Sequence, residues 1–110
     1  MTFEEYQQKS RKTALYPKVE GKGWIYPALG LASEAGEVGG KLKKVIRDTG
    51  GEIDAERKND IADELGDVLW YVAQLATELD LQMGELAQAN IDKLYSRLDR
   101  GKIQGSGDKR

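Results

Sequence analysis

Two pairs of acidic residues are the feature of this sequence best suited to perform chemistry. Glu34 and Glu37 stand three positions apart. Glu64 and Asp67 repeat that spacing further along the chain, after 26 intervening residues. Residues three apart in a helix share one face, so two such pairs on neighbouring antiparallel helices can bring four carboxylates to one point. Because oxygen ligands favour Mg²⁺ or Mn²⁺ over zinc, the pattern predicts a magnesium site that would also accept Mn²⁺.

Either pair alone is weak evidence, because helices often carry acids at this spacing on a solvated face. Both pairs adjoin apolar positions, however, which places them at the boundary or in the interior of a bundle. The surrounding helical segments also contain Gly36, Gly39, Gly40 and Gly66. Each glycine costs a helix about 1 kcal/mol relative to alanine. We therefore interpret these glycines as allowing a second helix or a ligand to approach the backbone closely.

Clustered carboxylates repel one another, and a divalent cation between them would convert that repulsion into binding energy. The chain has no histidine and no cysteine, which excludes imidazole zinc sites, Glu-x-x-His di-iron sites and histidine-activated nucleophiles. Mg²⁺ held by a few carboxylates takes further ligands from substrate phosphates and can lower the pKa of a water nucleophile. A glutamate of the site would then accept the proton of that water, and Glu34 and Glu37 are the candidates.

Basic and polar residues near the acids are candidate contacts for a polyphosphate. Lys41 and Lys44 follow Glu37 by one and two helical turns, although each taken singly is better explained as a solubilising cation near a helix C-terminus. Asn90 and Lys93 share a polar stripe on the last helical segment, and we expect them to contact substrate oxygens.

Two aromatic residues are candidates for stacking against a nucleobase. Tyr71 follows Asp67 by one helical turn, and Trp24 lies just before the second helical segment. An amphipathic aromatic residue on a helix more often packs in a core or an interface, which is the competing interpretation for both.

The elements that must position these residues are helices. Thr2 with Glu5 forms a capping-box pattern, and Gly50 stands where a helix C-cap is expected. Apolar residues recur at helical spacing in four segments: 2–14, 26–47, 54–79 and 83–100. The sequence predicts an all-α bundle of about four helices, two of them long and central, over residues 1–100. A glycine-rich tail follows at 101–110.

Composition limits the other possibilities. Of 110 residues, 39% are apolar and 33% charged, so a helical domain that buries further surface by self-association fits well. The net charge of −2 argues against a general nucleic-acid or membrane-surface binder. No apolar run approaches the roughly 20 residues that span a bilayer, and the polar N-terminus has no signal-peptide core. With no cysteine, a cytoplasmic protein is the simplest expectation.

The text around the acids resembles the MazG-like all-α nucleotide pyrophosphohydrolases. The matching stretches are Leu29–Glu37, which reads LGLASEAGE, and Ala62–Tyr71, which reads ADELGDVLWY. The similarity begins near Trp24, continues through Asn90–Leu94 and reaches the Gly-Ser-Gly-Asp tail. It therefore covers most of the chain.

This resemblance implies hydrolysis of nucleoside triphosphates between the α- and β-phosphates, giving a monophosphate and pyrophosphate. It implies Mg²⁺ or Mn²⁺ held by four acids, here Glu34, Glu37, Glu64 and Asp67. It also implies a homodimer, or a dimer of dimers, in which helices of two chains complete the bundle and the site. In related dCTP and dUTP pyrophosphatases, aromatic residues and an asparagine enclose the base, which the resemblance carries over to Trp24, Tyr71 and Asn90.

Two other functions remain open. Phosphoribosyl-ATP pyrophosphohydrolases have similar acid motifs and would use the same chemistry on a different nucleotide. A non-catalytic helical module for oligomerisation or partner binding would carry the same acids as surface charges. The second alternative predicts that Mg²⁺ does not stabilise the protein.

Overall fold

The computed structural model describes residues 1–110 and contains four α-helices and no β-strand. The helices are α1 (Phe3–Arg11), α2 (Ile25–Thr49), α3 (Ala55–Glu78) and α4 (Met83–Asp99). This confirms the predicted all-α class with two long central helices. None of the helices combines the length and the apolar character needed to cross a membrane.

The helix ends follow the capping residues of the sequence. The Thr2 side chain accepts a hydrogen bond from the Glu5 amide (3.1 Å) and begins α1. Asp54 does the same for Arg57 (2.8 Å) and begins α3. Gly50 ends α2 in a left-handed conformation with φ 65°, which glycine adopts without steric cost. Helices α2 to α4 end within two residues of the predicted bounds, whereas α1 is shorter and ends at Arg11.

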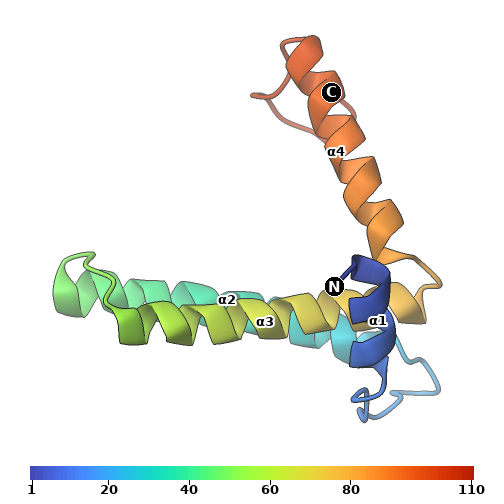
Figure 1. Cartoon of the computed structure of the whole chain (residues 1–110), viewed down its shortest axis with the longest axis horizontal. Helices are drawn as coiled ribbons and strands as arrows, with labels where there is room; N and C mark the ends of the chain where they lie inside the picture. The colour runs from blue at the N-terminus through green and yellow to red at the C-terminus, as the bar shows by residue number, and fades with distance from the viewer.

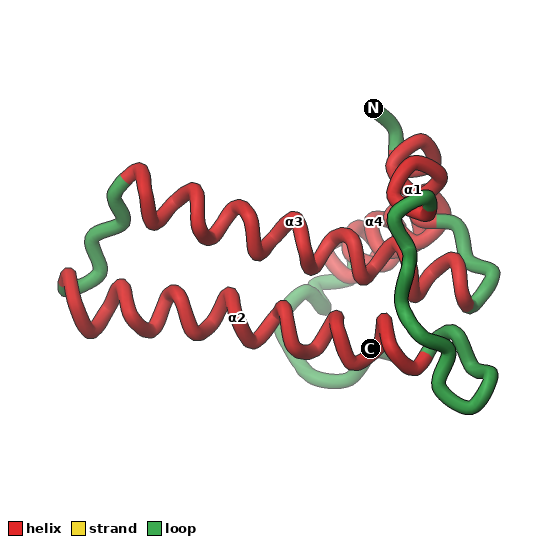
Figure 2. The backbone as a smooth tube through the Cα atoms, turned by 90° about the horizontal axis from the view of Figure 1, so that it is seen from below, coloured by secondary structure: helices red, strands yellow, loops and turns green.

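Helices α2 and α3 form an antiparallel hairpin that is the main body of the chain (Figure 2). Helix α1 packs across the end of α3, and α4 leaves that end and points away from the hairpin (Figure 1). The chain measures 43 × 43 × 30 Å along its principal axes. One chain is thus a helical hairpin with two additional helices at one end, and α4 does not close a bundle over it.

The hydrophobic core of a single chain is small, because only one face of each long helix is covered. The buried hydrophobic side chains are Val45, Ala73, Ala76 and Met83, and Pro27 near the start of α2 is also buried. The helical spacing of the apolar residues predicts that one face of each helix is buried, but most of these residues are not buried in one chain: Leu65 is 54% exposed and Leu98 is 62% exposed. That prediction was wrong for one chain. The apolar stripes exist, but no further helix of the same chain packs on them.

A buried glutamine joins α1 to the corner between α3 and α4. The Gln7 side chain donates to the Thr77 hydroxyl (3.0 Å) and to the Leu81 carbonyl (2.8 Å), and accepts from the Met83 amide (2.9 Å). These bonds satisfy the Leu81 carbonyl in the loop between α3 and α4 and the Met83 amide at the start of α4. Gln7 therefore fixes the point from which α4 departs.

The tail after α4 folds back without forming a helix, as the sequence predicts. The Arg110 guanidinium donates to the carbonyls of Lys102, Ile103 and Gly107. The buried guanidinium of Arg97 on α4 donates to the Asp108 carbonyl. These contacts hold residues 101–110 against the C-terminal half of α4.

Candidate metal centre

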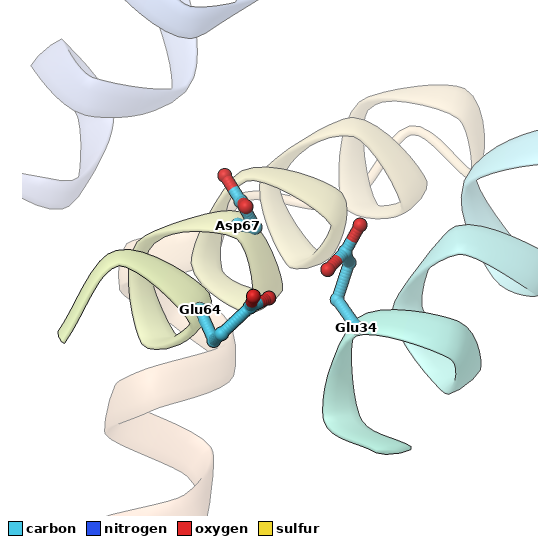
Figure 3. Close-up of side chains that lie close together, drawn as sticks. All are labelled: Glu34, Glu64 and Asp67. Atoms are coloured by element: carbon cyan, nitrogen blue, oxygen red, sulfur yellow. The ribbon is translucent and has the colours of Figure 1, made fainter. Parts of the chain in front are cut away.

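Three of the four predicted acids meet between α2 and α3. Glu34, Glu64 and Asp67 each offer a carboxylate oxygen, and these oxygens lie within 4.8 Å of one another. Figure 3 shows Glu34 extending from α2 toward the two acids of α3. Glu37 lies one turn further along α2, is exposed, and stands outside this group. We call Glu34, Glu64 and Asp67 the acid cluster.

The acid cluster is short of positive charge. The Glu64 side chain is only 16% exposed, and its Oε2 atom is buried without a hydrogen-bond partner. Its Oε1 atom lies 3.6 Å from the Lys41 ammonium. A hydrogen bond with Glu64 raises the pKa of Glu34, and burial and the nearby charges of Glu64 and Asp67 raise it further. A buried carboxylate oxygen without a partner is costly, and its surroundings fit a cation bound by oxygen ligands.

An aromatic residue sets the distance between the two helices beside the acid cluster. The Tyr71 ring packs against the backbone of Gly30, one turn before Glu34, where a Cβ atom would collide with it. Burial raises the pKa of Tyr71, and the charge of Glu34 contributes to the shift. Tyr71 thus borders the acid cluster, as its spacing from Asp67 predicted.

The glycines that permit close contacts differ from those expected. A Cβ atom at Gly36, Gly39, Gly40 or Gly66 would meet nothing within 4 Å. No helix of the same chain approaches these glycines. Close approach by a ligand or by a helix of a second chain stays a prediction. The close approaches occur instead at Gly30, beneath the Tyr71 ring, and at Gly23 and Gly84, beneath glutamate side chains.

The predicted basic residues lie on the loop side of the acid cluster. Lys41 contacts Glu64 directly. Lys41 and Lys44 both line a cavity of about 280 Å³ that opens between α2 and α3 further along the hairpin. Lys41 therefore joins the acid cluster to this cavity, whereas Lys44 lies in the cavity wall and pairs with none of the acids.

Three other predicted contacts are not beside the acids within one chain. Trp24 immediately precedes α2 and is 44% exposed, roughly 15 Å from Glu34 by helical rise. Asn90 lines an apolar cavity at the base of α4. Lys93 lies 3.9 Å from Asp108 of the tail. Because α4 points away from the hairpin, Asn90 and Lys93 would reach the acids only through a second chain. Trp24 is kept from the acids by its place at the start of α2, and its role also stays a prediction.

Sequence reasoning identified Tyr71 but not the other aromatic residues that pack around it. Tyr16 and Tyr26 stack with ring centroids 5.6 Å apart. Trp70 meets Tyr16 and Tyr71 edge-on at 6.1 and 5.0 Å. Tyr16 and Tyr26 lie in the loop before α2 and at the start of α2, where helical periodicity gives no signal. Only the number of aromatic residues between Tyr16 and Tyr26 could have indicated that these two side chains pack together.

Comparison with known proteins connects this site to a family. The MazG nucleotide pyrophosphohydrolase domain matches residues 28–101, which include the acid cluster, Glu37 and both lysines. The Gene 37 protein of Mycobacterium phage L5 is 47% identical over 114 aligned positions, covering 100% of both chains. No solved structure matches the chain.

Proposed function

Since the chain belongs to the MazG nucleotide pyrophosphohydrolase family, we propose that it cleaves nucleoside or deoxynucleoside triphosphates between the α- and β-phosphates. The products are a nucleoside monophosphate and pyrophosphate, and the reaction depends on Mg²⁺. The observation that carries this proposal is the acid cluster, with its buried and unpartnered Glu64 oxygen, inside the matched range.

The donor atoms of the acid cluster suit a hard divalent cation, because all of them are carboxylate oxygens. Glu34, Glu64 and Asp67 would hold Mg²⁺, or Mn²⁺ in its place, and Glu37 is the fourth proposed ligand from the next turn of α2. When bound, the ion would neutralise phosphate charge and lower the pKa of a water nucleophile.

Side chains in and around the acid cluster would carry out the remaining steps of the reaction. Glu34 and Glu37 are the proposed acceptors for the proton of the attacking water, because the chain contains no histidine. Lys41, held beside Glu64, would contact a phosphate oxygen on the same face. Tyr71 borders the acid cluster and would contact the nucleoside.

We further propose that the functional form is a homodimer or a dimer of dimers. The exposure of Leu65 on α3 and of Leu98 on α4 supports this proposal, because such apolar surface is normally covered. A second chain packed on α2, α3 and α4 would complete the bundle. It would also bring Trp24, Asn90 and Lys93 toward the nucleotide.

The activity is tested by incubating the full chain with each common ribo- and deoxynucleoside triphosphate in Mg²⁺. The expected products are equal amounts of monophosphate and pyrophosphate, with no release of orthophosphate, and chelation of the metal should abolish the reaction. Cleavage of phosphoribosyl-ATP alone would favour the other pyrophosphohydrolase. Absence of all cleavage, together with no stabilisation by Mg²⁺, would favour a non-catalytic module.

A further inference from the structure

A cavity between α2 and α3 lies beside the acid cluster, beyond Lys41. It has a volume of about 280 Å³ and is lined by side chains of α2 and α3. Lys41, Lys44 and Arg57 supply three cationic groups to its wall. Lys41 lines the cavity and its ammonium also lies 3.6 Å from Glu64, so the cavity adjoins the acid cluster through Lys41.

The three cations are available to an anion to different degrees. Lys41 faces Glu64 at 3.6 Å, and Lys44 pairs with no carboxylate. Arg57 donates one guanidinium hydrogen bond, from Nη1 to Asp54 (2.6 Å), which leaves its Nε and Nη2 groups unpaired in the protein. Lysine and arginine with free donors are the groups that bind phosphate oxygens most strongly.

The cavity wall also contains two carboxylates, Asp48 and Asp60. Asp48 accepts two hydrogen bonds from Arg47, at 2.6 and 3.0 Å, so its charge already has a partner. Asp60 remains in the wall and would repel a free polyanion. Because the wall contains this carboxylate as well as the cations, it favours a phosphate ligand that carries a bound divalent cation over a free polyanion.

The acid cluster has different neighbours on its two sides along the hairpin. Tyr71 and Gly30 lie on one side of the acid cluster, and Lys44 and Arg57 lie on the other. The cavity wall contains no aromatic residue, so it has no surface on which a base could stack. An aromatic end suits a nucleoside, and a cationic end suits its terminal phosphates.

We propose that this cavity binds the β- and γ-phosphates of the substrate and retains them as the leaving pyrophosphate, through Lys44 and Arg57. This inference rests on the proposed function, and it adds Arg57 and the orientation of the nucleotide. The nucleoside lies toward Tyr71, the α-phosphate lies at the acid cluster, and the leaving group points toward the loop between α2 and α3.

The test is a calorimetric titration of the full chain with inorganic pyrophosphate in the presence of Mg²⁺. Lys44→Gln and Arg57→Gln should each weaken binding about tenfold, as expected for loss of one charge-assisted hydrogen bond. Lys43→Gln is the matched control, since Lys43 is the exposed neighbour on α2 and does not line the cavity. Arg57→Gln preserves the helix cap, because Asp54 bonds the backbone amide of residue 57.

Equal pyrophosphate affinity in wild type, Lys44→Gln and Arg57→Gln would overturn the assignment. Equal weakening by Lys43→Gln would also overturn it, because the effect would then be one of overall charge. The titration needs no turnover, so it separates this inference from the proposed function. A chain that cleaves no nucleotide would refute the function, whereas the cavity assignment depends only on pyrophosphate binding.

Discussion

The Tyr71 ring rests on the backbone of Gly30, and this contact brings α2 and α3 together one turn from the acid cluster. Any side chain at residue 30 would occupy the position of the ring. The spacing of the acids therefore depends on a glycine that carries no chemistry itself.

Replacing Gly30 with alanine should push Tyr71 or α2 out of place and destabilise the fold by about 1–3 kcal/mol, as overpacking commonly does. Urea unfolding of Gly30→Ala against wild type measures this change. Gly39→Ala is the matched control in the same helix, because a Cβ atom there meets nothing within 4 Å. It should unfold at or slightly above the wild-type midpoint. Equal stability of the two variants would contradict the packing argument.

Loss of the Gln7 side chain should destabilise the corner from which α4 departs. Gln7→Ala leaves the Met83 amide and the Leu81 carbonyl without their partner. We expect a cost of about 2–4 kcal/mol, because unpaired buried polar groups are expensive. Gln8→Ala, at the exposed neighbouring position, should change the free energy of unfolding by less than about 0.5 kcal/mol. A small effect of Gln7→Ala would show that α4 is anchored by other contacts.

The ion pair between Arg11 and Glu78 predicts how the free energy of unfolding depends on pH. The hydrogen bond from Arg11 (2.7 Å) lowers the pKa of Glu78 from its ordinary value of 4.5. The stabilisation is therefore complete above that value and is lost as the pH falls through the lowered pKa of the folded state. Glu78→Gln should be less stable than wild type at pH 7, and the two free energies of unfolding should converge below pH 4.5. A gap that stays constant with pH would contradict this.

The helices could be predicted because local chemistry determines them. Thr2, Asp54 and Gly50 define helix ends by bonds within a few residues, and the structure places the ends there. The direction of α4 could not be predicted in the same way. It depends on Gln7, which bonds residues 70 to 76 positions away, and no pattern in the sequence indicates that contact.

At the candidate site, too, local spacing could be predicted from the sequence and long-range contacts could not. The spacing of Glu64 and Asp67 places both on one face of α3, and the acids of α2 were expected opposite them. The structure places Glu34 there and leaves Glu37 at the edge, because only one position of that pair points across the hairpin. The contact of Gly30 with Tyr71 was not predicted, because a glycine within a helix gives no indication of which side chain will cover it.

Self-association should depend on the apolar stripe of α4. Leu94 lies on that stripe, is 37% exposed, and would face a second chain. Leu94→Glu should shift the mass measured by light scattering toward the 12.2 kDa monomer, because a charge would be buried in an apolar interface. Gln88→Glu adds the same charge at an exposed polar position of α4 and should leave the mass unchanged. A monomeric wild-type protein would refute the proposed assembly.

The most direct test of the central claim is pyrophosphate release from deoxynucleoside triphosphates in Mg²⁺ by Glu64→Gln and its neighbour Asp63→Asn. Glu64 belongs to the acid cluster, whereas Asp63 is exposed and lies outside it. Loss of one ligand should reduce the rate by about 100-fold or more, and Glu34→Gln, Glu37→Gln and Asp67→Asn should do the same. The account predicts that Glu64→Gln loses pyrophosphate release while Asp63→Asn retains it; full activity in Glu64→Gln and one further acid variant would contradict it.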